Sequence, residues 1–107
     1  MIYDHRTYTV RPGTLPKHLQ LYQEYGKAPQ ERHLGRPLLY AFTETGELNT
    51  YVHVWAYEDA ADRARRRTAM QADPDWQGYL KRSAEAGYLI RQENKILTPV
   101  SFLETQR

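Results

Sequence analysis

Aromatic and aliphatic residues alternate between residues 51 and 57, and this stretch carries the side chains best suited to chemistry. Successive side chains of a strand point to opposite faces, so His53, Trp55 and Tyr57 share one face while small aliphatic residues occupy the other. An imidazole titrates near neutral pH, and an indole beside it offers a flat apolar wall. The spacing therefore predicts a small-molecule pocket with His53 as its candidate catalytic acid or base.

A second set of polar residues lies in the first predicted strand, residues 3–10. The same alternation puts Arg6 and Tyr8 on one face, which adjoins His53 if the first and third strands are neighbours. A guanidinium can hold an anionic group, and a tyrosine hydroxyl adds a hydrogen bond. Such a pocket suits a small aromatic or enol-like substrate. The predicted substrate-binding residues are Arg6, Tyr8, Tyr40 and Trp55.

The same residues permit a purely structural interpretation. Arg6 can pair with a carboxylate while His53 and Trp55 only pack across an interface, since interface cores are enriched in Tyr, Trp and Arg. Two functional hypotheses therefore stay open. With a catalytic His53 the protein would be a cofactor-independent enzyme of the oxygenase or isomerase type. In the structural interpretation it would be a non-catalytic ligand-binding or protein-interaction module. His5 has the opposite parity and would replace His53 if the strands faced the other way.

Composition excludes several classes of protein. The 107 residues include no cysteine, which rules out disulfides, thiolate catalysis and cysteine-ligated zinc. A net charge of +2 does not favour nucleic acid, and residues 49–55 lack the glycine typical of RNA-recognition strands. The four histidines are not spaced to meet at a metal, and nothing demands a cofactor. Without an apolar stretch long enough for a bilayer, the sequence predicts a soluble cytoplasmic protein with no membrane contact.

Turn and cap residues divide the first half of the chain. Residues 11–13 end the first strand, and Thr14 then caps a helix that should weaken near Gly26. Pro29 should block uninterrupted continuation, leaving a short helical turn at residues 30–33. The next predicted elements are strands at 38–45 and 49–57, joined by a short hairpin connection at Gly46 and Glu47.

The predicted helix after the third strand combines a cap with a run of arginines. Glu58 or Asp59 should cap it, and its alanines should form a small-residue packing face. Arg63, Arg66 and Arg67 share one side at i, i+3 and i+4. They could grip a phosphate or an acidic partner, but the favoured interpretation is a solvated face whose arginines pair with nearby carboxylates.

The remaining elements follow from a second set of boundary residues. Asp73 should cap a further helix with a proline at its first position, and Gly87 should end it. A final strand lies within residues 88–102 and should be irregular, because Pro99 cannot donate to a strand ladder. Residues 104–107 are predicted to fray.

These elements run in the order strand, helix, strand, strand, helices, strand. The order predicts a single domain over residues 1–107 with the α+β, ferredoxin-like βαββαβ arrangement, in which helices cover one side of a four-stranded antiparallel sheet. The other side of the sheet is left bare, and a domain of this size has little left to cover it. The expected cover is a partner subunit, a ligand or both, and pairing with a second copy would use only a modest fraction of the surface of the domain.

Several segments together resemble the NIPSNAP family within the dimeric α+β barrel superfamily. They are residues 3–13, 52–57, 61–67, 73–76 and 92–97. The resemblance implies a homodimer whose bare sheet faces meet and enclose a barrel-like cavity, which the pocket residues named above would line. It implies little chemistry, because the superfamily includes cofactor-free monooxygenases, isomerases, cyclases and haem enzymes. The family pattern has an acidic residue and a leucine before Arg-Thr-Tyr, where this chain has Asp4 and His5.

Overall fold

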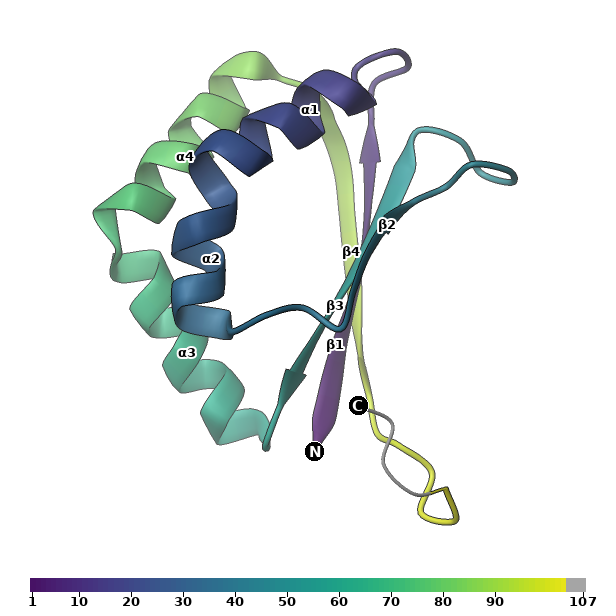
Figure 1. The fold of residues 1–107 in the computed structure, drawn as a ribbon, viewed down its shortest axis with the longest axis vertical. Coiled ribbons are helices and arrows are strands. Elements are labelled where there is room, and N and C mark those ends of the chain that lie inside the picture. The colour runs from purple at the N-terminus through teal and green to yellow at the C-terminus, as the bar shows by residue number, and fades with distance from the viewer. Residues whose placement is uncertain (104–107) are drawn as a thin grey trace.

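The computed structural model of the chain describes residues 1–103 and places a four-stranded sheet beside a layer of helices (Figure 1). In sheet order the strands are β2 (Leu39–Phe42), β3 (Thr50–Tyr57), β1 (Ile2–Val10) and β4 (Leu89–Leu97). Each strand pairs antiparallel with its neighbour, and the helices lie on one face of the sheet. The predicted ferredoxin-like α+β class is confirmed. The predicted frayed tail, residues 104–107, lies outside the described residues.

The register of the sheet brings the predicted pocket residues together. On β1, Arg6 pairs with His53 of β3 on one side and with Asn94 of β4 on the other. Asp4 pairs with Trp55 in the same way. Directly paired residues of neighbouring strands point to the same face, so all five side chains lie on one side of the sheet. The predicted shared face of Arg6 and His53 is confirmed.

One helical stretch follows β1 and changes type twice. It consists of α1 (Leu15–Leu21), a π-helix η1 (Tyr22–Gly26) and α2 (Lys27–Leu34). The expectation that Pro29 blocks uninterrupted continuation is wrong. The backbone N–H of Lys27 donates to the carbonyl of Tyr22, five residues back, which is the π-helical hydrogen-bond spacing. The helical stretch therefore continues through this point, and α2 begins at Lys27. Pro29 then falls in a first turn, where a missing N–H costs little.

The last two helices begin and end where the sequence predicts. α3 (Ala60–Ala72) is capped by Asp59, whose side chain accepts a hydrogen bond of 2.8 Å from the Asp62 N–H. Asp73 caps α4 (Pro74–Ala86) in the same way. Gly87 ends α4 with φ of +68°, a left-handed conformation that glycine adopts without penalty. No helix within residues 1–103 is both long and apolar enough to cross a membrane.

The packing face of α3 differs from the predicted one. Its alanines at positions 60, 61, 64 and 69 are exposed, whereas Met70 is buried. Alanine offers little area to bury, so the long Met70 side chain decides which side of α3 faces the sheet. Arg66 donates to Asp62 at 2.9 Å on the solvent side, which confirms the predicted carboxylate pairing for this arginine.

The connection from β2 to β3 is longer than predicted. β2 ends at Phe42, so residues 43–49 form the link instead of a two-residue turn. Side-chain contacts close it, because the Thr50 hydroxyl lies 2.7 Å from the Thr43 hydroxyl and donates to the Glu47 carbonyl at 2.6 Å.

β4 has nine residues, and its pairing with β1 is irregular, because Thr9 pairs with Arg91 whereas Val10 pairs with Leu89. The predicted irregularity of this strand is therefore present, but Pro99 is not its cause, since Pro99 lies beyond the end of the strand at Leu97.

The aromatic face of β3 is covered by the helices of the same chain. Trp55 and Tyr57 are buried against Met70 of α3 and Trp76 and Tyr79 of α4. The expected position of this face between the sheets of two subunits is wrong. Bulky aromatic side chains bury more area against a helix layer than the small aliphatic side chains do, so the aliphatic face of β3 points outward instead.

Candidate functional site

A cavity of about 440 Å³ separates the helix layer from the sheet. Its floor is formed by side chains of β1, β2, β3 and β4, and its roof by side chains of η1, α2, α3 and α4. The volume lies within the range that small-molecule sites occupy. One chain therefore builds a partly open site between its own sheet and helices.

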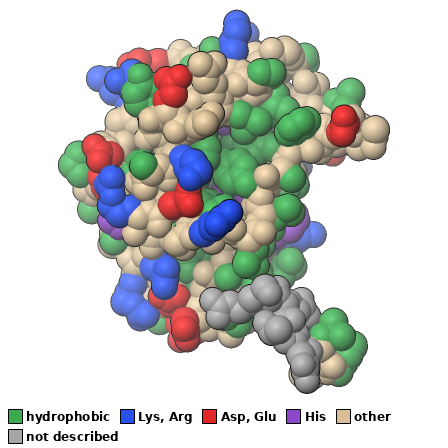
Figure 2. Space-filling view, viewed as in Figure 1, with side chains coloured by type: hydrophobic (Ala, Val, Ile, Leu, Met, Phe, Trp, Pro, Cys, Tyr) green, Lys and Arg blue, Asp and Glu red, His purple; other side chains and the backbone are tan. Residues whose placement is uncertain are grey.

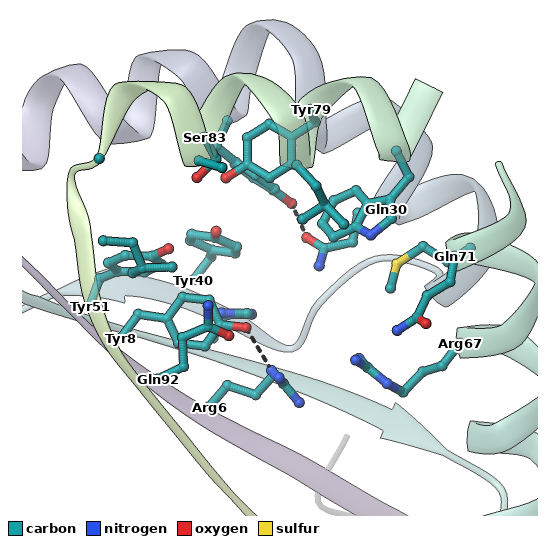
Figure 3. A pocket seen from close by; sticks show the side chains of 18 residues that line it. Arg6, Tyr8, Gln30, Tyr40, Tyr51, Arg67, Gln71, Tyr79, Ser83 and Gln92 are labelled. Atoms are coloured by element: carbon teal, nitrogen blue, oxygen red, sulfur yellow. Dashed lines mark hydrogen bonds between the residues drawn. The ribbon is translucent and has the colours of Figure 1, made fainter. Parts of the chain in front are cut away.

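Two arginines supply the positive charge of this cavity, Arg6 from β1 and Arg67 from α3. Figure 3 shows their side chains pointing toward one another across the open space. Arg6 is held in place, because its Nε donates to the Tyr8 hydroxyl at 2.9 Å and its Nη1 to Asp4 at 3.1 Å. Arg67 has no carboxylate partner within residues 1–103. None of the described lining residues is acidic, so the cavity favours an anion.

Asp4 anchors the arginine side of the site. It is fully buried, and its carboxylate accepts hydrogen bonds from Arg6, from Arg63 at 3.0 Å and from Asn94 at 3.0 Å. Burial alone would raise the pKa of Asp4, but the Asn94 hydrogen bond and the two arginine charges outweigh it and hold the pKa below its usual value. The carboxylate is thus ionised and shared between two arginines, which leaves this region with excess positive charge.

His53 lines the cavity as a neutral side chain. It is 2 % exposed, and the indole Nε1 of Trp55 donates to its Nδ1 at 2.7 Å. Burial, with the charge of Arg6 as a second cause, lowers the pKa of His53 to about 3. Its Nε2 is buried and has no hydrogen-bond partner in the part of the chain that the structure describes. The imidazole therefore contributes one unsatisfied polar atom to the site.

Tyrosine rings form the other walls. Tyr40 stacks on His53 with ring centroids 4.8 Å apart and on Tyr22 at 5.0 Å. Burial raises the pKa of Tyr79 to about 12 and those of Tyr22, Tyr40 and Tyr51 still further above the usual value. The hydroxyls are therefore protonated at neutral pH. The walls offer flat aromatic surfaces with neutral polar tips, which suit a planar ligand.

A wider groove meets the cavity at the stacked pair of Tyr22 and Tyr40. Both rings line the cavity and also a groove of about 800 Å³ between α1, α2 and β2. Lys27, Arg36 and Leu38 also line this groove. Figure 2 shows hydrophobic side chains gathered in a hollow between the helices and the sheet. The tyrosine pair thus separates the internal space from a surface that carries basic side chains and the carboxylate of Glu31, which pairs with Lys27.

The structure brings together four of the five predicted site residues. Arg6, Tyr8, Tyr40 and His53 line the cavity. Trp55 does not line it, because it is fully buried behind His53 and reaches the site only through its hydrogen bond to the imidazole. The functional roles of these residues remain predictions.

Sequence reasoning missed the contribution of the helices. Arg67, Gln71 and Ser83 line the cavity, and the favoured solvated interpretation of the arginine run did not single out Arg67. A usable signal was present, since Arg63, Arg67 and Met70 are spaced i, i+4 and i+7 and so share one side of a helix. A buried Met70 brings both arginines to the sheet.

The other three histidines do not join the site, and His5 lies on the outer face of the sheet, where it pairs with Val54. His18 is buried on α1, where its Nε2 lies 2.6 Å from the Tyr51 hydroxyl, and His33 contacts Asp73 at 2.8 Å. No group of three or more metal-ligating His, Asp or Glu side chains forms within residues 1–103. The absence of a cofactor stays a prediction from the sequence.

Solved structures similar to this chain share its fold over nearly its whole length. An uncharacterized NIPSNAP-like domain protein from Burkholderia xenovorans is 41% identical with a TM-score of 0.88, covering 97% of this chain and 89% of that chain. Protein Atu4242 from Agrobacterium tumefaciens is 36% identical with a TM-score of 0.89, covering 97% and 98%. An antibiotic biosynthesis monooxygenase, 14% identical with a TM-score of 0.61 over 94% of this chain and 99% of that chain, is similar in fold alone.

Curated relatives are longer proteins. The Caenorhabditis elegans NipSnap protein K02D10.1 is 26% identical over 98% of this chain but only 19% of its own length. The relatives from Dictyostelium discoideum and Drosophila melanogaster are matched over 43% and 37% of their lengths, so the chain spans less than half of each curated relative. The NIPSNAP family model matches residues 3–104. This chain therefore belongs to the NIPSNAP family.

Proposed function

We propose that the cavity binds a small aromatic or enol-like molecule that carries an anionic group such as a carboxylate. The observation that supports this most directly is Arg67, a partly buried arginine that points at Arg6 across the cavity and has no carboxylate partner in residues 1–103. Two guanidinium groups can grip a planar carboxylate from both sides, and the tyrosine walls fit a flat ring. Binding is the activity that this arrangement supports most directly.

Turnover by His53 as a base receives less support. The Nδ1 lone pair accepts the Trp55 indole N–H, and in a neutral imidazole the other nitrogen then carries the proton. Neither nitrogen has a free lone pair with which to remove a proton from a ligand. The proposal is therefore a ligand-binding protein, in preference to the oxygenase or isomerase type of enzyme that the sequence left open as one of two hypotheses.

Replacing Arg67 with methionine should weaken the binding of a carboxylate ligand by about 10- to 100-fold, because a hydrogen bond to a charged group contributes about 1.5–3 kcal/mol. The probe is benzoate, titrated into ¹⁵N-labelled protein and followed by NMR, with benzyl alcohol as the uncharged comparison. Arg66→Met is the matched control, since Arg66 is one residue away on α3 but pairs with Asp62 outside the cavity. Unchanged benzoate affinity in Arg67→Met, or no saturable shift with benzoate at all, would contradict the proposal.

We also propose that two copies pair through the outer face of the sheet. Val52 and Val54 of β3 point to this face, and Leu39, the partner of Val54 on β2, is 48 % exposed. No helix in the described part of the chain covers it. An uncovered apolar sheet face is a common basis for association.

Sedimentation velocity at micromolar concentration tests the pairing. The wild-type protein is expected as a dimer and Val54→Glu as a monomer, because Val54 lies on β3 between His5 of β1 and Leu39 of β2. A charge at that position would be desolvated by the partner. The control Thr68→Glu changes an exposed residue of α3 and should leave the dimer intact. A wild-type monomer, or a Val54→Glu dimer, would overturn the pairing.

A further inference from the structure

We propose that His53 determines which ligands the cavity accepts, by donating a hydrogen bond from its Nε2–H to a carbonyl or enolate oxygen of the ligand. The ligand would then carry an oxygen acceptor in addition to its anionic group. This inference rests on the proposed binding function and specifies the class of molecule bound. Trp55 acts as a positioning residue, since it touches His53 and not the cavity.

The tautomer follows from the chemistry of the indole. The Trp55 Nε1–H is a donor with no lone pair, so the Nδ1 atom of His53, 2.7 Å away, must be the acceptor. A neutral imidazole with an unprotonated Nδ1 carries its hydrogen on Nε2. The buried position of His53 favours this neutral form, because a charged imidazole would be desolvated there next to Arg6.

The Nε2 atom is a buried donor without a partner, on a residue that lines the cavity. Three buried side-chain polar atoms lack a hydrogen-bond partner within residues 1–103: His18 Nδ1, His53 Nε2 and the Tyr57 hydroxyl. Among these residues His53 lines the cavity, whereas His18 and Tyr57 do not. A buried donor without an acceptor costs free energy that a ligand oxygen can recover. The proposal places the acceptor of the ligand against this atom, where the bound molecule displaces the side chains that now cover it.

The neighbouring groups favour an oxygen with partial negative charge. Arg6 lies directly across from His53 in the strand register, so its positive charge reaches the same part of the cavity. The rings of Tyr8 and Tyr40 contact the imidazole at centroid distances of 4.7 Å and 4.8 Å and fix its plane. A fixed donor beside a cation distinguishes a carbonyl or enolate oxygen from an alkyl group of equal size.

The first experiment measures the tautomer without any ligand. Long-range ¹H–¹⁵N NMR of the histidine rings should show His53 as the Nε2–H tautomer at pH 7, and Trp55→Phe should populate the Nδ1–H form. A wild-type Nδ1–H tautomer would overturn the inference, as would a Trp55→Phe spectrum identical to that of the wild type. This readout separates the positioning role of Trp55 from simple packing, because phenylalanine keeps an aromatic ring but has no N–H.

The second experiment compares two probes of nearly equal shape, 4-acetylbenzoate and 4-isopropylbenzoate. The wild-type protein should bind the acetyl compound at least about tenfold more tightly, because its carbonyl oxygen satisfies the Nε2–H. His53→Gln should keep most of this preference, since its amide also donates, and His53→Phe should lose it. Equal binding of both probes by the wild-type protein would overturn this inference alone. Failure of both probes to bind would instead count against the proposed function.

Discussion

Replacing Asp4 by alanine is expected to lower the free energy of unfolding by about 3 kcal/mol, because it leaves buried arginines without their counter-charge. Asp4 is fully buried and holds Arg6 and Arg63, whose side chains are 13 % and 28 % exposed. Because both arginines are partly exposed, water can solvate their charges when the carboxylate is removed. The expected loss therefore lies at the low end of the range for breaking a buried ion pair. Urea unfolding at pH 7, followed by tryptophan fluorescence, measures the loss.

The pH dependence of this loss follows from the pKa of Asp4. The native pKa lies below the ordinary value of 3.8, so the unfolded chain binds a proton more readily than the native one. The stability that Asp4 contributes is therefore complete well above pH 4 and disappears as the pH falls through the native pKa. The difference between the wild-type protein and Asp4→Ala should accordingly shrink below pH 4.

A matched control separates the buried pair from surface charge. Glu93 contacts Arg91 at 3.2 Å, but both side chains are more than half exposed, so Glu93→Gln should change stability little. A loss below about 1 kcal/mol in Asp4→Ala would show that the shared carboxylate does not support the sheet.

Gly26→Ala is expected to destabilise the protein by about 1–3 kcal/mol through overpacking. A Cβ atom at this position would lie 2.8 Å from Cδ1 of Tyr22 and 3.0 Å from two ring atoms of Tyr79. Both rings are buried in the cluster that roofs the cavity, so neither can move away without disturbing its neighbours. Thermal and urea unfolding measure the change.

Gly78 provides the opposite case within the same helix layer. It lies inside α4, and a Cβ atom added there would meet no atom of residues 1–103 within 4 Å. Gly78→Ala should therefore stabilise the protein by about 0.5–1 kcal/mol through helix propensity alone. Equal effects of the two substitutions, in either direction, would show that the close approach of Gly26 to the tyrosine rings has no energetic role.

Local sequence signals were sufficient for the order of elements and for side-chain parity. Asp59, Asp73 and Gly87 bound their helices as predicted because capping and left-handed conformations depend on one or two residues. The shared face of Arg6 and His53 follows from strand alternation together with the neighbouring position of β1 and β3. These features need no knowledge of distant packing.

The direction in which that face points could not be predicted in the same way. Tyr, His and Trp side chains are typical of interfaces. The sequence did not show that their polar atoms form hydrogen bonds within one chain. In the structure the Tyr51 hydroxyl meets His18, and the Trp55 indole meets His53. The π-helical turn was missed for a related reason, since it depends on how Tyr22 and Gly26 pack against Tyr79 rather than on local propensity.

Because the cavity lies within a single chain, a ligand bound there and the proposed subunit interface would be connected by one short route. Alternate side chains of β1 and β3 point to the cavity and to the outer surface. His53 points to the cavity, whereas its chain neighbours Val52 and Val54 point to the outer surface. A ligand that shifts this pair of strands would also displace the side chains on the opposite surface, which are only one residue away along the strand. In the proposed dimer the two central strands would separate the cavity from the subunit interface, and no path through the helices would be required.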